Sequence, residues 1–298
     1  MSQLSKRFGH VSALNSVSLR VFPGETYGFL GPNGAGKTTT IRLLLGFIRP
    51  SGGTCAIFGH DCWSDGVAAR RHLGFLVSSS TLYPDLTGTA YLDYAATLAQ
   101  RAPTLQPLLL DALELDPATL DRKIGGYSKG MSQKLALVGC MQTAPRLLIM
   151  DEPTDGLDPL MQRAFEQLIV RLRERGTTIF MSSHDLAEVE RVCERVAIIR
   201  AGHIVTEAAI AELTARQPRV IQVTFAGPAP DWPTSASIRI QERAGSRLVL
   251  SVRGDTRPVL AHLAARDDVV DVLVARPTLE QIFHEFYAPV GDQAREPL

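Results

Sequence analysis

Residues 31–38, close to the N-terminus, constrain the fold of this chain more than any other stretch. They fit the pattern G-x-x-x-x-G-K-[ST], which here follows an apolar run at 26–30 and precedes a segment at 39–48 with apolar residues at helical spacing. Glycines let the backbone curl so that successive N–H groups point at phosphate oxygens, and the positive end of the following helix adds to the attraction. The sequence therefore predicts a phosphate-binding loop between a buried strand and a helix.

Two side chains of this loop have defined expected roles. Lys37 is predicted to reach the β- and γ-phosphates of a nucleotide, and the Thr38 hydroxyl is predicted to ligate Mg²⁺. The alternative, a glycine-rich turn whose lysine is merely solvated, is disfavoured because every motif position is filled and both flanks are of the right type. The residues expected to contact the nucleotide are Gly31, Pro32, Asn33, Gly34, Ala35, Gly36, Lys37, Thr38 and Thr39.

Two adjacent carboxylates and one histidine extend the predicted site. Asp151 and Glu152 directly follow an apolar run at 147–150, and His184 follows another predicted strand at 177–182. Asp151 is expected to hold Mg²⁺, while Glu152 polarises the water that attacks the γ-phosphate and His184 orients that water. In isolation the carboxylates indicate a polar strand end and the histidine a structural or solvated side chain, but the glycine loop favours catalysis. We expect Glu152, His184 and Lys37 to be catalytic.

The order of predicted elements indicates the fold class. Apolar runs alternate with helical segments on either side of a stretch at about 78–144, which argues for an α/β fold, a mostly parallel sheet with helices on its faces. The stretch itself predicts helices, one capped by Thr87, one capped by Ser128 and one interrupted early by Pro107. Short strands, including one at 17–21, are expected ahead of the glycine loop.

A composition shift near residue 217 separates a second part of the chain. Short β-type runs and two helices, the last at 278–287, predict a small α+β domain there. We therefore expect a nucleotide-binding domain at 1–215 that contains the helical insert, the α+β domain at 216–288, and a flexible tail at 289–298.

Composition excludes several classes of partner and site. Lys and Arg together number 31, as do Asp and Glu, so bulk charge favours neither nucleic acid nor an anionic membrane. The four cysteines lack C-x₂-C spacing, which argues against a metal site or a disulfide framework and for reduced thiols in the cytosol. No apolar run approaches the roughly 18 residues that a membrane span requires, and the N-terminus lacks a signal-peptide pattern. We expect a soluble chain whose membrane role comes through a partner.

Taken together, the motifs resemble those of the nucleotide-binding subunits of ABC transporters. The segment 127–131, Tyr-Ser-Lys-Gly-Met, resembles the signature sequence of that family, and 147–152 resembles its Walker B strand. Residues 155–158 resemble the D-loop, and 182–184 resemble the switch histidine. The resemblance covers residues 5 to about 210. It implies a P-loop NTPase (RecA-like) core with an antiparallel β subdomain and a helical insert.

The resemblance also implies a mechanism and partners. In this family two copies pack head to tail, with ATP between the P-loop of one subunit and the signature of the other, so ATP and Mg²⁺ are the expected cofactors. ATP-driven closure and hydrolysis-driven opening act on a separate transmembrane permease, which places such a subunit at the cytoplasmic face of the membrane. No nucleic acid is expected as a partner. The resemblance adds Phe8, Ser128, Lys129, Gly130, Met131 and Asp158 to the residues expected at the ATP site.

The residues of the signature and the C-terminal part resemble one subfamily in particular. Tyr-Ser-Lys-Gly-Met, together with an α+β appendage that contains 277–283, is similar to ABC-2 type exporters, which handle drugs, antibiotics, lipids or polysaccharides. The resemblance assigns cargo recognition to the permease.

Three positions depart from the family pattern. Ser78 occupies the place of the Q-loop glutamine or glutamate, and a serine is too short to reach both Mg²⁺ and the permease contact. Phe8 replaces the adenine-stacking tyrosine, which preserves the ring. The chain begins where a relative carries several more residues that form the first strand, so we expect either a truncated start or a missing edge strand.

Two alternatives remain open. One is a non-transport ABC protein that acts on ribosomes or DNA; a single cassette, the lack of a heptad insert and the balanced charge disfavour it. The other is a regulatory module that binds ATP with little turnover because of Ser78.

Overall fold

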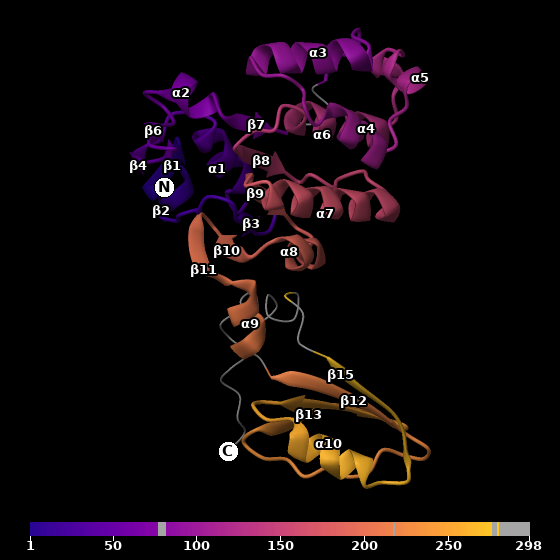
Figure 1. Cartoon of the computed structure of the whole chain (residues 1–298). Helices are drawn as coiled ribbons and strands as arrows, with labels where there is room; N and C mark the ends of the chain where they lie inside the picture. Colours follow the sequence, from indigo (N-terminus) through magenta and orange to yellow (C-terminus); the bar gives the residue numbers. More distant parts are fainter. Residues whose placement is uncertain (77–81, 217, 276–278, 280–298) are drawn as a thin grey trace. The chain divides into compact units, whose positions relative to one another are not determined.

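The computed structural model describes residues 1–76, 82–216, 218–275 and 279 of the chain (Figure 1). Its contacts divide the chain into two compact units, 1–208 and 209–298. The division lies on the N-terminal side of the boundary expected between 215 and 216. Each unit is described by itself below.

A six-stranded sheet forms the centre of the first unit, in the order β11-β10-β3-β9-β8-β7. Neighbouring strands from β10 to β7 run parallel, with β3 between β10 and β9. The predicted α/β class is therefore confirmed. The strands are β3 (Thr26–Leu30), β7 (Leu73–Phe75), β8 (Leu147–Asp151), β9 (Thr178–Ser183), β10 (Arg195–Arg200) and β11 (His203–Ala209).

Helices cover both faces of this sheet. Tyr27 and Phe29 of β3 share a buried cluster with Ile41 of α1 (Lys37–Leu44), whereas a side chain at Gly28 would lie 2.7 Å from Val189 of α8 (Leu186–Val192). Successive residues of a strand point to opposite faces, so α1 and α8 cover opposite faces of the sheet. Another helix, α7 (Pro159–Glu174), packs against β9 and α8.

Two strands ahead of the glycine loop, β1 (Ser2–Phe8) and β2 (Val11–Val17), form an antiparallel sheet with β4 (Gly52–Thr54), which follows the loop; the order is β2-β1-β4. Ser2–Phe8 form the central strand of this sheet, so the expected alternative of a missing edge strand is wrong, while the truncated start stays a prediction. The strand predicted at 17–21 is also wrong, because β2 ends at Val17. A hairpin of β5 (Ala56–Ile57) and β6 (His60–Asp61) and the short helix α2 (Gly66–Arg70) follow.

The described part of 78–144 is mostly helical (Figure 1). The Thr87 hydroxyl accepts the N–H of Ala90 at 3.1 Å, as expected for a helix cap. Pro107 does not interrupt its helix, because it lies in the first turn, where the missing N–H has no helical partner. The elements are α3 (Gly88–Ala99), α4 (Gln106–Ala112), α5 (Pro117–Leu120), the 3₁₀ helix η2 (Ile124–Gly126) and α6 (Lys129–Met141).

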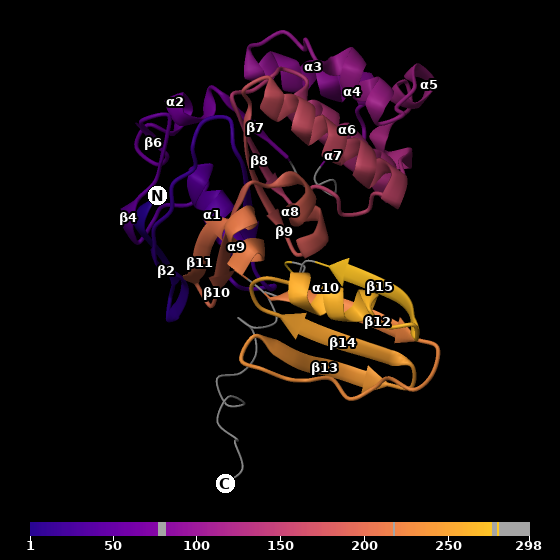
Figure 2. The same ribbon diagram turned by 60° about the horizontal axis from the view of Figure 1, so that its bottom comes forward.

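The second unit contains an antiparallel sheet in the order β13-β14-β12-β15, with α10 packed on one face (Figure 2). Ile221, Leu250 and Leu263 belong to the buried cluster between them. The helix expected at 278–287 and the tail at 289–298 lie outside the described residues, apart from Leu279. The elements are α9 (Ile210–Arg216), β12 (Arg219–Phe225), β13 (Ile238–Ala244), β14 (Arg247–Val252), α10 (Arg257–Ala264) and β15 (Val269–Ala275).

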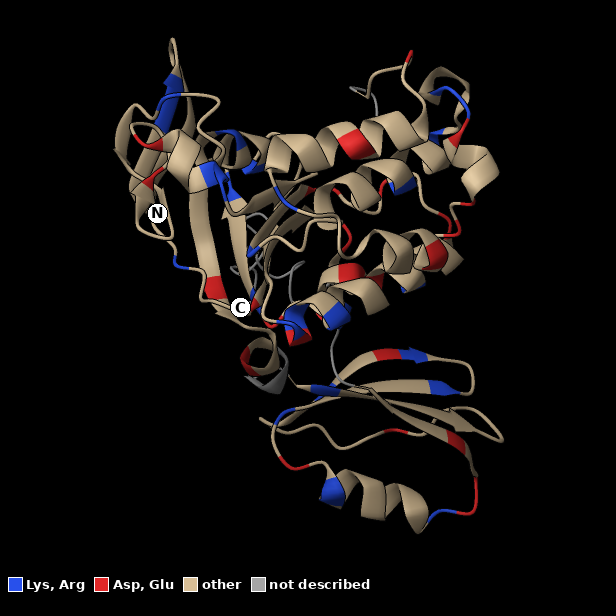
Figure 3. Ribbon diagram, turned by 45° about the horizontal axis from the view of Figure 1, so that its top comes forward, with Lys and Arg blue, Asp and Glu red and all other residues tan. Residues whose placement is uncertain are grey.

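Basic and acidic residues are interspersed along the described part of the chain (Figure 3). None of the helices in that part combines the length and the apolar composition that a membrane span needs.

Candidate functional site

The glycine loop follows the carboxyl end of β3, where close packing explains two of its glycines. A Cβ at Gly31 would lie 2.4 Å from the carbonyl oxygen of Ile199 on β10, and a Cβ at Gly36 would lie 2.8 Å from the carbonyl oxygen of Ala13. Gly36 also has φ of +114°, a conformation that L-residues rarely adopt. The loop is therefore held against the sheet with no room for side chains at these positions, and α1 begins directly after it.

Lys37 begins α1 and its side chain is buried. Its Nζ donates to the carbonyl oxygen of Gly31 at 2.6 Å and lies 3.6 Å from Glu152 Oε1. Lys37 and Glu152 line one pocket of about 220 Å³ at the carboxyl edge of the sheet. The described residues around that pocket are Ala13, Pro32, Asn33, Gly34, Gly36, Lys37, Thr38, Thr39, Asp151 and Glu152.

Asp151, the last residue of β8, is held by two hydroxyl groups. Thr38 Oγ1 donates to Asp151 Oδ2 at 2.9 Å, and Ser182 Oγ donates to Asp151 Oδ1. Ser182 faces Asp151 because the two residues are register partners in the parallel pairing of β8 and β9. A hydroxyl and a carboxylate are hard oxygen donors that suit Mg²⁺, which is usually bound through one or two carboxylates plus substrate phosphates. Thr38 and Asp151 are therefore a donor pair of the kind that fits Mg²⁺.

Glu152 and His184 form the closest contact between ionisable side chains in the site. His184 Nδ1 lies 2.6 Å from Glu152 Oε2, and the backbone N–H of His184 donates to the same oxygen at 3.2 Å. The backbone N–H of Glu152 donates to the carbonyl oxygen of Ser182 at 3.2 Å. Glu152 has φ of +51°, which is an uncommon conformation for a residue with a side chain. The carboxylate is thus fixed between Lys37 and His184.

The predicted signature residues lie at the start of α6 and do not line the pocket of their own chain. Ser128 Oγ accepts the N–H of Met131 at 3.2 Å, the bond expected of a helix cap. Lys129 Nζ pairs with Asp155 at 2.8 Å, and a Cβ at Gly130 would lie 3.1 Å from the carbonyl oxygen of Gly156. The predicted signature therefore packs against the predicted D-loop of the same chain.

Asp158 and Phe8 are two further residues that the sequence analysis places at the nucleotide site. Asp158 begins α7 as its cap, accepting the N–H groups of Leu160 and Met161 at 3.0 Å each. Phe8 ends β1 with its ring about half exposed, and Lys6 Nζ lies 4.9 Å from the ring centre. Neither Asp158 nor Phe8 lines the pocket among the described residues, and Ser78 lies outside them.

The structure adds one residue and one contact that the motifs do not specify. Ala13 of β2 lines the pocket, although nothing in its sequence context indicates a site. Ser182 was part of the switch segment, but its contact with Asp151 depends on the β8–β9 register, which the sequence does not contain.

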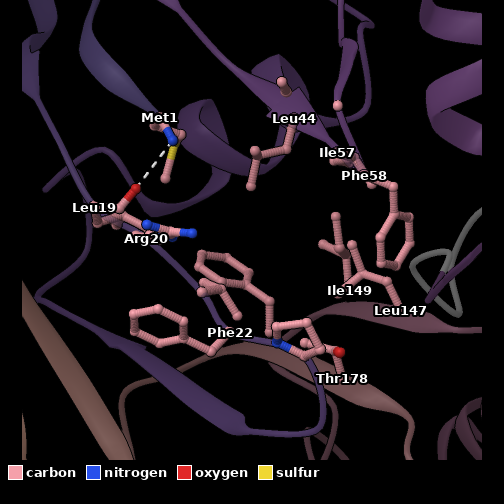
Figure 4. Close-up of a pocket in the computed structure, with 15 residues that line it drawn as sticks. Met1, Leu19, Arg20, Phe22, Leu44, Ile57, Phe58, Leu147, Ile149 and Thr178 are labelled. Atoms are coloured by element: carbon pink, nitrogen blue, oxygen red, sulfur yellow. Dashed lines mark hydrogen bonds between the residues drawn. The ribbon is translucent and has the colours of Figure 1, made fainter.

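A larger, mostly apolar pocket of about 350 Å³ lies at the opposite edge of the sheet (Figure 4). Leu147 and Thr178, the first residues of β8 and β9, line it together with Phe22, Leu44 and Ile57. Arg20 supplies the charged side chain among the described residues of this lining. Without a glycine loop or a carboxylate pair, this pocket lacks the chemistry of a phosphate site, despite its larger volume.

Comparisons with known proteins agree with the motifs. A family model described as "ABC transporter" matches residues 14–155. A Nod factor export ATP-binding protein I of Burkholderia lata is 35% identical over 270 residues, which are 88% of each chain. An uncharacterised ABC transporter ATP-binding protein of Nostoc sp. is 41% identical over 212 residues, which are 70% of this chain and 63% of that protein.

A solved structure described as an ATP-binding subunit of an ABC transporter has a similar fold. Its TM-score is 0.67 at 30% sequence identity, and the match covers 71% of this chain and 90% of that one. The predicted P-loop NTPase core with an antiparallel β subdomain is thereby confirmed.

Proposed function

Because this chain belongs to the ABC transporter family of ATP-binding proteins, we propose that it is the ATP-hydrolysing subunit of an exporter. ATP hydrolysis is the activity of this family. The observation that carries the proposal is the convergence of Lys37, Asp151, Glu152 and His184 at one edge of the sheet. These groups come from three strand ends, and parallel sheets bind ligands at that edge.

The geometry supports a division of roles at the γ-phosphate. The N–H groups of the glycine loop and the ammonium group of Lys37 bind phosphate oxygens and offset their charge. Glu152 accepts a proton from water as the water oxygen bonds to the γ-phosphorus and the bond to the β,γ-bridging oxygen breaks, giving ADP and phosphate. His184 holds Glu152 through two contacts to one oxygen. Mg²⁺, when held by Thr38 and Asp151, supplies positive charge to the phosphate oxygens.

We propose that a second copy of the chain completes this site. Ser128 and Gly130 lie at the N-terminal end of α6, a 13-residue helix whose free N–H groups suit a phosphate. They do not line the pocket that contains Lys37, so one chain holds two halves of a site that do not meet within it. A head-to-tail dimer, with ATP between Lys37 of one copy and Ser128 of the other, brings the halves together. Asp158, at the start of α7, and Phe8, as the adenine-stacking ring, belong to the same proposal.

The role of this chain in export is proposed from its similarity to a relative that is named for export. A relative that shares 35% of its residues over 88% of both chains is named for Nod factor export, and this likeness extends into the C-terminal unit. We propose an ABC-2 type exporter in which the chain binds a separate permease at the cytoplasmic face of the membrane. The test is to purify the chain with the product of a neighbouring gene that encodes a six-span protein and to reconstitute both in liposomes. Stimulated ATP hydrolysis supports the proposal, and equal rates with and without that protein oppose it.

The variant Glu152→Gln tests the hydrolytic role. The amide keeps the size of the carboxyl group and one acceptor oxygen but accepts a proton far less readily, so turnover should fall by about 10² to 10⁴-fold while ATP binding is retained. The matched control is Glu166→Gln, which changes a carboxylate of α7 that pairs with Arg191 outside the pocket. Undiminished turnover in Glu152→Gln contradicts the role of the glutamate.

A further inference from the structure

The first turn of α8 carries a buried carboxyl group that the proposed reaction does not use. Glu188 is 2% exposed, and its Oε2 accepts a hydrogen bond from Ser183 Oγ at 2.7 Å. Glu188 Oε1 has no hydrogen-bond partner among the described residues. Burial raises the pKa of this carboxyl to about 7, although the nearby hydroxyl groups of Ser183 and Thr154 oppose that shift. Burying a carboxyl group is unfavourable unless it gains specific contacts, so an apolar side chain would serve a purely structural purpose at least as well.

The hydroxyl group of Ser183 connects this carboxyl group to the chain segment that carries His184. Ser183 is the last residue of β9, is fully buried, and pairs with Leu30, the residue before the glycine loop. Its Oγ accepts the backbone N–H of Asp185 at 3.0 Å while it donates to Glu188. Ser183 therefore links the backbone of Asp185, the residue after His184, to the side chain of Glu188.

A hydroxyl group has one proton, and the structure offers two acceptors for it. Glu188 Oε2 lies at 2.7 Å from Ser183 Oγ, and the carbonyl oxygen of Asp185 lies at 3.4 Å. The nearer, carboxyl acceptor is favoured, since hydrogen bonds weaken steeply with distance. Without it, the proton has the carbonyl oxygen of Asp185 as its remaining close acceptor, and the link from Ser183 to Glu188 is lost.

The position of His184 depends on the segment 183–185. Its backbone N–H and its Nδ1 both contact Glu152 Oε2, so a small shift of the segment changes two contacts to the proposed general base at once. We propose that Glu188 is a positioning residue that acts through Ser183 to hold His184 against Glu152. The proposal rests on the proposed ATP hydrolysis. It assigns Glu188 no contact with the nucleotide.

The test compares steady-state ATP hydrolysis by the full-length chain and three variants. Glu188→Met has a similar length but no acceptor, and we expect kcat to fall by about 10 to 100-fold, as for other groups that orient a site residue. KM for ATP should change less than about 2-fold, because the contacts of Lys37 stay intact. Glu188→Gln keeps an acceptor oxygen and should retain kcat within about 3-fold. Glu166→Met is the matched control, since Glu166 also anchors α8, through Arg191, and its kcat should not change.

A double-mutant cycle separates positioning from general loss of structure. If Glu188 acts through His184, Glu188→Met should cause no further loss of kcat in a His184→Ala background. Multiplicative losses in the double mutant overturn the proposal, and so does an equal loss in Glu188→Gln and Glu188→Met. If Glu188→Met does not fold, Ser183→Ala removes the donor instead and should lower kcat to the same degree; undiminished kcat in Ser183→Ala overturns the proposal.

The outcomes also distinguish this inference from the proposed function. Wild-type and Glu166→Met chains that both fail to hydrolyse ATP overturn the proposed function, and the inference with it. Active wild-type protein with an equally active Glu188→Met variant overturns the inference alone.

Discussion

His184 Nδ1 lies 2.6 Å from Glu152 Oε2, and the backbone N–H of His184 donates to the same oxygen at 3.2 Å. The two residues directly follow β8 and β9, so the parallel pairing of these strands brings them together. Lys37 contacts the other oxygen of the same carboxylate at 3.6 Å. Glu152 is therefore oriented from both sides, which is the arrangement required for the general base that we propose it to be.

The first prediction concerns His184. In His184→Ala the Nδ1 contact to Glu152 is lost, and we expect kcat to fall by about 10²-fold with KM for ATP within a few-fold, because the phosphate contacts remain. The measurement is steady-state phosphate release. His203→Ala, which removes a histidine that contacts Asn15, is the control and should be as active as the wild type. A His184→Ala variant with wild-type kcat contradicts the prediction.

The second prediction concerns the hydroxyl group of Ser182. It donates to Asp151 Oδ1 and orients the carboxylate that is proposed to hold Mg²⁺. In Ser182→Ala the Mg²⁺ concentration for half-maximal activity should rise by about 10 to 100-fold. A Mg²⁺ titration of ATP hydrolysis measures this. Ser64→Ala breaks a similar bond, to Asp61 at 2.8 Å, and should leave the Mg²⁺ requirement unchanged.

The third prediction contrasts two glycines of the loop. A Cβ at Gly31 would lie 2.4 Å from a backbone oxygen, so Gly31→Ala should lower the free energy of unfolding by about 3 kcal/mol or more. Gly34 has open space around it but φ of +79°, so Gly34→Ala should cost only about 1 kcal/mol, the penalty of a left-handed conformation. Urea unfolding measures both values. Equal losses contradict the packing argument.

The fourth prediction concerns pH. Burial raises the pKa of Glu188 to about 7 in the folded chain from an ordinary value of 4.5. Between these values the folded state keeps a proton that the unfolded state releases, so the free energy of unfolding decreases as pH rises through this range and levels off above it. The Glu188→Gln variant has no titratable side chain at this position, so its free energy of unfolding lacks this contribution. The wild type should therefore lose about 2.5 kcal/mol relative to Glu188→Gln between pH 5 and pH 8, measured by urea unfolding at each pH. A constant difference between the two proteins contradicts the assignment.

The motifs predicted the pocket because its groups lie at strand ends. The glycine loop, Asp151 and Glu152 each follow an apolar run, and the carboxyl ends of parallel strands share one edge, so their convergence could be expected without the register. The contacts within the pocket could not be expected from the sequence, because they depend on which residues of neighbouring elements face each other. Ser182 meets Asp151 through strand register, and Ala13 reaches the loop through the packing of β2 against α1.

Two errors in the predicted elements have local causes. Alternation at 17–21 indicated a strand, but β2 ends at Val17; beyond it Leu19 exchanges backbone hydrogen bonds with Met1, ahead of β1, without extending the strand. Pro107 was expected to interrupt a helix, but a proline in the first turn favours a helix start. The burial of Glu188 could not be predicted, since its spacing on α8 is typical of a solvated charge.

The central claim is that the ATP site needs Lys37 of one copy and Ser128 of another. The most direct test mixes two variants, Lys37→Ala and Ser128→Arg, each expected to be inactive alone. Mixed dimers contain one site with both changes and one intact site, so an equal mixture should regain roughly a quarter of wild-type ATP turnover. A mixture that stays as inactive as its components, although both variants fold and Ser128→Arg still binds ATP, contradicts the claim.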